Sequence, residues 1–151
     1  MDKIQLGELL KSINPEYDIK EGKDYLEVTV PSSLLYAFAR QLREREELQF
    51  DYLFCLSGVD YGQDLGVVYH LRSTKYDHVV VIKTRISDRV NPILDSVSDI
   101  WKTADFHERE VFDLLGIKFA NHPDLRRLFL DKSWGFPLRK DYVDDINIVT
   151  K

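Results

Sequence analysis

The sequence has little of what a redox protein or a nucleotide-binding enzyme needs. It contains one cysteine, Cys55, in 151 residues. It therefore has neither the four thiolates of an iron–sulfur cluster nor a disulfide framework, and a reducing, cytosolic setting fits this usage. Its glycines form neither a GxGxxG fingerprint nor a phosphate-binding loop, and Ser57 lies outside a GxSxG motif. The residues alone indicate no redox centre, nucleotide site or hydrolytic nucleophile.

Long apolar runs and an excess of positive charge are also missing. No stretch approaches the ~20 apolar residues that cross a bilayer, and the opening MDKIQLGELLKSI is too polar for a signal peptide. Lys and Arg number 21 against 26 Asp and Glu, which gives a net charge of -5 that repels phosphate backbones. We therefore expect no nucleic-acid partner, and contact with a membrane only through another protein.

What the sequence does have is the composition of one globular domain, with 44% hydrophobic and 31% charged residues. Helical spacing predicts a short helix over 6–13, a second helix that opens at 31–33, and a third that begins at Ser96, Ser98 or Asp99 and ends at Gly116. Period-two alternation predicts strands over 17–20, 25–30, 50–57, 65–72 and 76–85. Glycines 58, 62 and 66 have the spacing of a hairpin turn between strands.

The order of these elements, α-β-β-α-β-β-β-α, predicts an α+β fold. Short connections imply antiparallel neighbours, and the run over 79–82 is apolar on both faces, which marks a central strand. We expect a two-layer sandwich, with a mostly antiparallel sheet of about five strands, helices on one face and an irregular C-terminal tail. Residues 1–120 would form the domain, and residues 121–151 an extended docking segment.

A polar cluster interrupts the apolar face of the last predicted helix. Successive helical residues turn by about 100°, so the four polar residues 107–110 cover every direction, including the inward one. Glu108 is the inward residue, because it lies four positions after Ala104 and four before Phe112. A buried carboxylate needs a partner, and the guanidinium groups of Arg126 or Arg127 are the natural donors. We interpret this as a structural ion pair that holds the C-terminal segment on the helix.

The same region contains residues of the types that bind metal ions or act as general acids and bases, namely His107, Glu108, Glu110, Asp113 and His122. Their order is not HExxH, and two ligands on one helical face plus a distant histidine are a weak signal. A free-standing enzyme that uses Glu108, His107 and His122 is the alternative. It predicts that these three side chains converge in an open pocket.

The segment 117–142 follows no regular period, yet it is rich in aromatic and basic residues. Interface cores favour such residues, and long structureless segments in compact domains are uncommon unless they are functional. The basic side chains would face an acidic patch on a partner protein. RNA binding is a minor alternative, because aromatic residues are interleaved with the basic ones, and part of the segment would wrap its own domain.

Three blocks of this region carry a family resemblance: Glu108-Arg109-Glu110-x-Phe112-Asp113-Leu114-Leu115-Gly116-Ile117, then His122-Pro123-Asp124-Leu125-Arg126-Arg127, then Pro137-Leu138-Arg139-Lys140-Asp141-Tyr142. Over residues 99–142 the chain resembles the thirty-kilodalton subunit of NADH:quinone oxidoreductase, respiratory complex I. The same family includes components of energy-converting membrane-bound hydrogenases and of ferredoxin- or F420-dependent complexes. One departure is the Trp-Gly-Phe-Pro before Leu138, where family members commonly have one residue more.

The resemblance implies a scaffold subunit of the peripheral arm that has no redox centre or catalytic site of its own. It would dock on the large subunit near the quinone site, or on the nickel-iron hydrogenase-like subunit, beside iron–sulfur subunits, on the cytoplasmic side of the membrane. FMN, iron–sulfur clusters and quinone would belong to other subunits. Glu108 with Arg126 and Arg127 is assigned to fold-pinning, and the expected docking residues are Arg109, Glu110, Asp113, His122, Pro123, Trp134, Arg139, Lys140 and Asp141.

Overall fold

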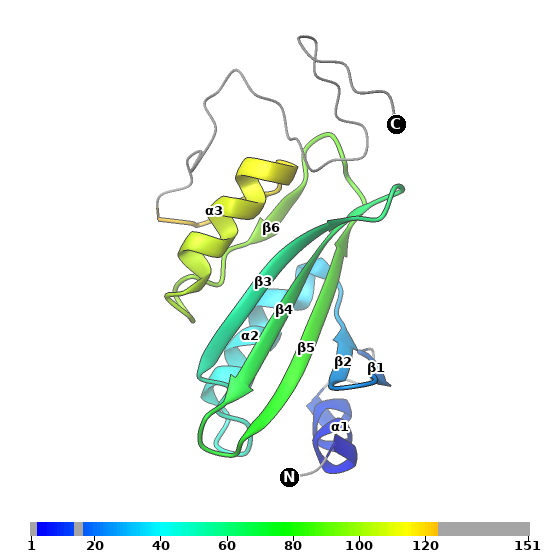
Figure 1. Cartoon of the computed structure of the whole chain (residues 1–151), viewed down its shortest axis with the longest axis vertical. Coiled ribbons are helices and arrows are strands. Elements are labelled where there is room, and N and C mark those ends of the chain that lie inside the picture. Colours follow the sequence, from blue (N-terminus) through cyan, green and yellow to red (C-terminus); the bar gives the residue numbers. More distant parts are fainter. Residues whose placement is uncertain (1–2, 14–16, 124–151) are drawn as a thin grey trace.

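The computed structural model describes residues 3–13 and 17–123 (Figure 1). Its elements in chain order are α1 (Lys3–Ile13), β1 (Asp18–Glu21), β2 (Leu26–Thr29), the 3-10 turn η1 (Ser32–Leu34), α2 (Leu35–Glu44), β3 (Tyr52–Asp60), β4 (Leu65–Ser73), β5 (His78–Ile86), β6 (Ile93–Asp95), α3 (Ala104–Leu115) and β7 (Lys118–Ala120). The α+β class is confirmed, and the predicted elements occur in the predicted order. The sequence does not predict the short strands β6, before α3, and β7, after it. The expected boundary between residues 120 and 121 stays a prediction.

The main sheet has five strands in the order β1-β2-β5-β4-β3. Strands β3, β4 and β5 form an antiparallel meander, because connections of four residues join each to the next. Strand β2 pairs with β5 in parallel, with Leu26 opposite Val80. The expectation of antiparallel neighbours does not cover this parallel pairing. The sequence does not predict it, because α2, β3 and β4 separate β2 from β5 in the chain. A second, short parallel pair joins β6 to β7.

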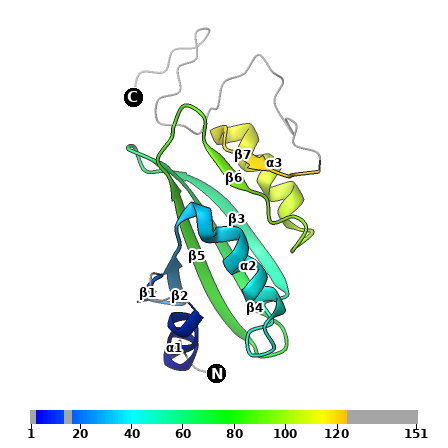
Figure 2. The same cartoon turned by 180° about the vertical axis from the view of Figure 1, so that it is seen from behind.

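The helices cover one face of the main sheet. Figure 2 shows α2 in front of the long strands and α3 beside β3, whereas Figure 1 looks at the opposite face, which the described helices leave open. Alternation in β4 follows this asymmetry: Leu65, Val67, Tyr69 and Leu71 are buried, and Arg72 is exposed. Strand β5 lies between β2 and β4 and buries both Val80 and Val81, so its predicted central position is confirmed.

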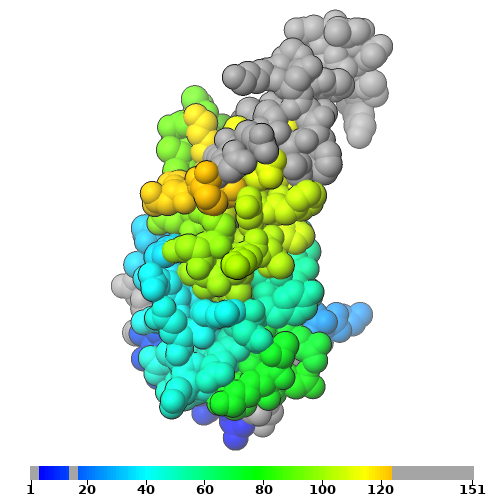
Figure 3. All heavy atoms as spheres, turned by 90° about the vertical axis from the view of Figure 1, so that its left-hand side faces the viewer, coloured from blue at the N-terminus to red at the C-terminus, as the bar shows by residue number. Residues whose placement is uncertain are grey.

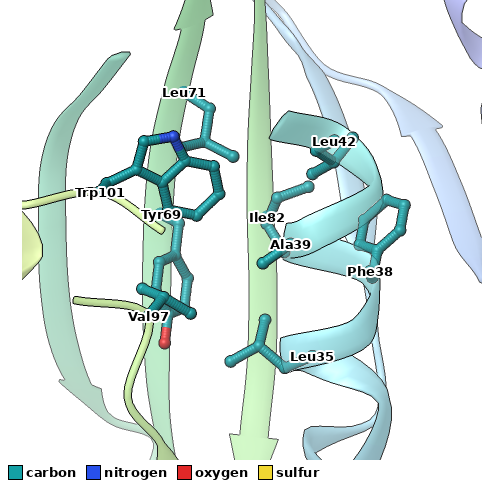
Figure 4. A pocket seen from close by; sticks show the side chains of 9 residues that line it. All are labelled: Leu35, Phe38, Ala39, Leu42, Tyr69, Leu71, Ile82, Val97 and Trp101. Carbon is teal, nitrogen blue, oxygen red and sulfur yellow. The ribbon is translucent and has the colours of Figure 1, made fainter. Parts of the chain in front are cut away.

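The core between α2 and the sheet is closed by the segment before α3. Trp101 and Val97 pack over Tyr69, opposite Leu35 and Leu42 of α2 (Figure 4). The indole Nε1–H of Trp101 donates to the carbonyl of Phe50 at 2.9 Å. Burial of such large side chains contributes roughly 1.5–3 kcal/mol each. This packing fixes the position from which α3 begins.

Helix α3 begins later than the sequence predicts. The structure starts it at Ala104 rather than at Ser96, Ser98 or Asp99. Its predicted end is confirmed, because Gly116 adopts φ 79° and donates its N–H to the carbonyl of Phe112. The start differs because Ser96 and Val97 hydrogen-bond to Glu108 in α3 and cannot also form the first turn of the helix.

Gly58 lies within β3 and not in the turn to β4, which corrects the expected position. The turn is instead closed by the N–H of Tyr61, which donates to the carbonyl of Asp64, and Gly62 adopts φ 93° there. A Cβ atom on Gly58 would lie 2.3 Å from Cδ1 of Leu115. Glycine is needed at this position because α3 approaches the strand closely. Gly66 likewise lies within β4.

No helix among the described residues is long and apolar enough to cross a membrane.

We predict that Gly58→Ala destabilises the protein by roughly 1–3 kcal/mol, because the added methyl group would overpack the contact between β3 and α3. Gly7→Ala is the matched control: its Cβ would make ordinary contacts, the nearest at 3.7 Å, and alanine favours the helix α1 by up to about 1 kcal/mol. Chemical denaturation of the two variants checks this. Equal stability of Gly58→Ala and the parent chain would show that α3 is not held against Gly58.

Candidate functional site

The candidate site is a buried carboxylate in the middle of α3. Glu108 is fully buried, as its spacing from Ala104 predicts. Its neighbours on the same helix face, Ala104, Val111 and Leu115, pack into the core. A charged group in such surroundings costs several kcal/mol unless hydrogen bonds compensate it. The neighbouring donors therefore decide whether this carboxylate is stable in the fold.

Both oxygens of Glu108 accept hydrogen bonds from the segment that follows β6. The hydroxyl of Ser96 donates to Oε1 at 2.6 Å, and the backbone N–H of Val97 donates to Oε2 at 2.9 Å. Ser96 is itself held in place, because its hydroxyl accepts from the N–H of Ser98 at 3.1 Å and its own N–H donates to the carbonyl of Ala120 in β7. Glu108 therefore ties α3 to the β6–β7 pair.

His122, just after β7, closes the other side of the carboxylate. Its side chain is fully buried, and its Nε2 lies 3.1 Å from Oδ1 of Asp105 and 3.9 Å from Oε1 of Glu108. The same Nε2 lies 3.2 Å from the carbonyl of Asp105. Since all three neighbouring atoms are oxygen acceptors, a proton on Nε2 satisfies them best. These contacts join Ser96, Val97, Asp105, Glu108 and His122 in what we call the Glu108 junction, in which the side chains of Glu108 and His122 are fully buried and that of Asp105 is partly exposed.

Burial is the main cause of the shifted pKa of Glu108. Loss of solvent raises the pKa of Glu108 to about 7. The hydrogen bonds from Ser96 and Val97 act in the opposite direction, and the charges of Asp105 and Asp99 raise the pKa further. Burial also raises the pKa of Tyr69 well above its usual range, with the charge of Glu108 as the second cause. Glu108 consequently exchanges its proton near neutral pH.

The structure brings together only part of the predicted site. Among the expected docking residues, Arg109 and Glu110 are half-buried and Pro123 is exposed, whereas the side chains of Asp113 and His122 are fully buried. Arg126, Arg127, Trp134, Arg139, Lys140 and Asp141 lie outside the described residues. The ion pair of Glu108 with Arg126 or Arg127 therefore stays a prediction.

The metal alternative receives no support from the described part of the chain. Residues 3–13 and 17–123 contain no group of three His, Cys, Asp or Glu side chains placed to hold a metal ion. The acid/base alternative requires Glu108 in an open pocket, and Glu108 is instead enclosed with both oxygens bonded.

Sequence reasoning misses three members of the Glu108 junction, namely Ser96, Val97 and Asp105. Local rules predict that Ser96 caps a helix, and it serves instead as the donor to Glu108 twelve residues later. Asp105 is not singled out by any motif, although it contacts His122. No spacing rule links these residues, because they meet only through the return of β7 beside β6.

Comparison with known proteins places this geometry in a family. Residues 28–145 match the family model described as the 30 Kd subunit of respiratory-chain NADH dehydrogenase. The matched range includes the end of β2, strands β3 to β7, α3 and the Glu108 junction.

Curated relatives are similar over most of this chain. The C subunit of NADH-quinone oxidoreductase from Moorella thermoacetica is 38% identical over 136 residues, which cover 88% of this chain and 90% of the relative. The C/D subunit of NADH-quinone oxidoreductase from Phocaeicola vulgatus is 48% identical over 122 residues, which cover 80% of this chain and 23% of the relative. The chain thus spans about a quarter of the length of the C/D relatives it matches.

Two solved structures share the fold. One belongs to the membrane-bound sulfane sulfur reductase, an archaeal respiratory membrane complex, with a TM-score of 0.80 and 25% identity, covering 92% of this chain and 84% of that chain. The other is a trypsin-resistant fragment of Nqo5, with a TM-score of 0.67 and 27% identity, covering 81% of this chain and 98% of that chain.

We predict that Glu108→Ala destabilises the protein by about 3 kcal/mol, because it leaves a cavity and two buried donors, at Ser96 and Val97, without an acceptor. Equilibrium unfolding in denaturant at pH 6 measures the change. The matched control is Glu44→Ala, which removes an exposed carboxylate and its i,i+4 ion pair with Arg40. This substitution should lower the free energy of unfolding by less than about 0.5 kcal/mol. Equal effects of the two substitutions would contradict the assigned role of Glu108.

Stability should also depend on pH through Glu108. Its pKa is higher in the folded state, about 7, than the ordinary 4.5, so the folded protein binds this proton more tightly. The stabilising contribution is complete below about pH 4.5 and is lost as pH rises through 7, a change of roughly 3 kcal/mol. Glu108→Gln cannot titrate, and subtracting its unfolding curve from that of the parent chain isolates the effect. A difference that is flat from about pH 4.5 to 8 would contradict it.

Proposed function

Because this chain belongs to the family of the 30 kDa subunit of respiratory-chain NADH dehydrogenase, we propose that it is a non-catalytic scaffold subunit. Its place would be the peripheral arm of a proton-translocating NADH:quinone oxidoreductase. The observation that carries the non-catalytic role is the Glu108 junction. Glu108, a fully buried acid of the family-like segment 108–117, accepts hydrogen bonds from Ser96 and Val97. Both of its oxygens are therefore engaged in holding the fold together.

The proposed partner is the large subunit that borders the quinone site. The C/D relatives support this choice, because in them a region similar to this chain belongs to a polypeptide about four times as long. Joining two parts in one chain maintains a high effective concentration of each for the other, which suits parts that pack together. In this proposal the separate chain keeps the same contact without the covalent link.

The proposed contact surface extends from α3 into the residues after β7. Arg109, Glu110 and Pro123 are the described members that reach the surface. Asp113 and His122 would act from beneath it, by fixing the shape of the helix and of the chain that leaves β7. Trp134, Arg139, Lys140 and Asp141 complete the proposed surface from outside the described residues.

Cofactors and location follow from the partners in this proposal. FMN, iron–sulfur clusters and quinone would be held by other subunits, including neighbouring iron–sulfur subunits. The chain would lie on the cytoplasmic side of the membrane and be attached through the complex.

A second assembly is favoured by one specific observation. The likeness to a chain of the archaeal membrane-bound sulfane sulfur reductase complex extends over 92% of this chain. A scaffold of the same kind would therefore suit an energy-converting membrane-bound hydrogenase or a ferredoxin- or F420-dependent complex. There it would dock on the nickel-iron hydrogenase-like subunit, which occupies the place of the large subunit.

Co-purification tests the docking role. We predict that deleting residues 124–151, or the full-length substitution pair Arg139→Ala and Lys140→Ala, reduces the large subunit recovered with the affinity-tagged chain. The substitution pair should reduce it about tenfold, since loss of two interface cations costs on the order of 1.4 kcal/mol or more.

The matched control removes two exposed cations from elsewhere, with Lys11→Ala and Lys23→Ala. It should leave recovery unchanged. Full recovery of the large subunit with both test variants would refute the docking role, and turnover of NADH by the isolated chain would refute the non-catalytic one.

A further inference from the structure

The main sheet has a free edge at β3. This strand is the last in the sheet order, so one side of its backbone meets no other strand in the described part of the chain. An edge strand of nine residues is a ready template for pairing with another chain unless its polar groups are covered. The two halves of β3 differ in this respect.

Side chains cover the edge at the beginning of the strand. The indole of Trp101 donates to the carbonyl of Phe50, and the hydroxyl of Thr103 donates to the carbonyl of Leu53, both at 2.9 Å. A shift in register between Leu53 and Cys55 then separates this covered part from the rest. Such irregularities interrupt pairing along an edge. The protein thus protects the first half of the edge.

The second half of the edge has no such cover among the described residues. The hydrogen bond between Tyr61 and Asp64 closes the turn after β3, so these two residues form a hydrogen-bonded pair. Residue pairs in an antiparallel ladder alternate between bonded and non-bonded, so every second residue of β3, counted back from Asp60, is in a non-bonded pair. With Leu56 opposite Tyr69 and Gly58 opposite Val67, the backbone groups of Leu56 and Gly58 point away from β4. Within residues 3–13 and 17–123, no hydrogen bond reaches these outward groups.

A groove of about 210 Å³ opens beside this uncovered stretch, between β3 and α3. Ser57 and Gly58 line it from the strand, and Glu110, Val111 and Leu114 line it from the helix. Figure 3 views the molecule from the side on which α3 and β3 lie. Val111 gives the groove an apolar floor, and Glu110 gives it a negative rim. No Lys, Arg or His of the described chain pairs with Glu110.

We propose that this groove receives a short extended segment of the neighbouring subunit, which adds a strand to β3 at Leu56 and Gly58 and directs a lysine or arginine to Glu110. Strand addition suits an edge whose backbone groups are unpaired and whose neighbouring groove accepts side chains. Charge complementarity selects a basic residue, because Glu110 is the one ionisable group among the described residues that line the groove. This inference rests on the proposed function and names the kind of partner segment that one part of the docking surface takes.

Cross-linking within the complex tests which segment occupies the groove between β3 and α3. The chain carries the substitutions Cys55→Ser and Ser57→Cys, and a photoreactive maleimide label is attached to the new thiol in the purified, tagged complex. We expect adducts at one continuous segment of another subunit, with a lysine or arginine in that segment. A label at Glu8→Cys in the same Cys55→Ser background, on α1, should give no adduct with that segment.

Other outcomes overturn the inference. Adducts with residues 124–151 of this chain, with a second copy of the chain, or with nothing would each show that the groove does not receive a partner strand. Failure of the tagged chain to co-purify with any subunit would refute the proposed function instead. The two failures are therefore distinguishable.

Charge variants test the role of Glu110 independently. Glu110→Lys should reduce the recovered partner subunit by about tenfold or more, and Glu110→Gln by less. Glu8→Lys changes the net charge of the chain equally at a distant, exposed position and should have no effect. Thermal melting of the isolated variants verifies that they remain folded. Equal recovery with Glu110→Lys and Glu8→Lys would refute the pairing with a basic residue.

Discussion

The burial of one carboxylate, Glu108, is the constraint on which the C-terminal half of the described structure depends. A charge in the core is tolerated only when donors surround it, and the donors here come from Ser96 and Val97 rather than from the same helix. Residues 96–98 must therefore lie against α3, and the N–H of Ser96 in turn binds the carbonyl of Ala120. The same interaction thus delays the start of α3, places β7 beside β6 and brings His122 to within 3.9 Å of the carboxylate.

Close packing holds the same face of this helix against β3. Gly58 lets Leu115 approach β3 to a distance that no side chain on the strand would permit, and Gly116 ends the helix in a left-handed conformation. Because packing at Leu115 and hydrogen bonds at Glu108 both hold its buried face, α3 is a rigid base for the residues that follow it. That rigidity suits the proposed scaffold role, since a preformed surface loses less conformational entropy on binding.

Local rules predicted much of the fold and less of the site. The five strands of the main sheet, the second helix, the end of α3 at Gly116 and the inward direction of Glu108 all follow from periodicity and helix-end signals, which depend on near neighbours in the chain. The short strands β6 and β7 do not follow from such rules. The parallel pairing of β2 with β5 and the donors to Glu108 depend on contacts between distant segments. Ser96 is the clearest case: a serine near a helix start is a good cap candidate by local rules, and only the tertiary fold gives it to Glu108.

Glu108, in the role proposed for it, holds the scaffold together and takes no part in turnover. The most direct test is quinone reduction by the purified complex that contains Glu108→Gln, measured per assembled complex at neutral pH. We predict that the amount of complex changes while turnover per complex stays equal to that of the parent. Normal assembly together with a large loss of turnover per complex would contradict this role, because Glu108 would then act in the chemistry.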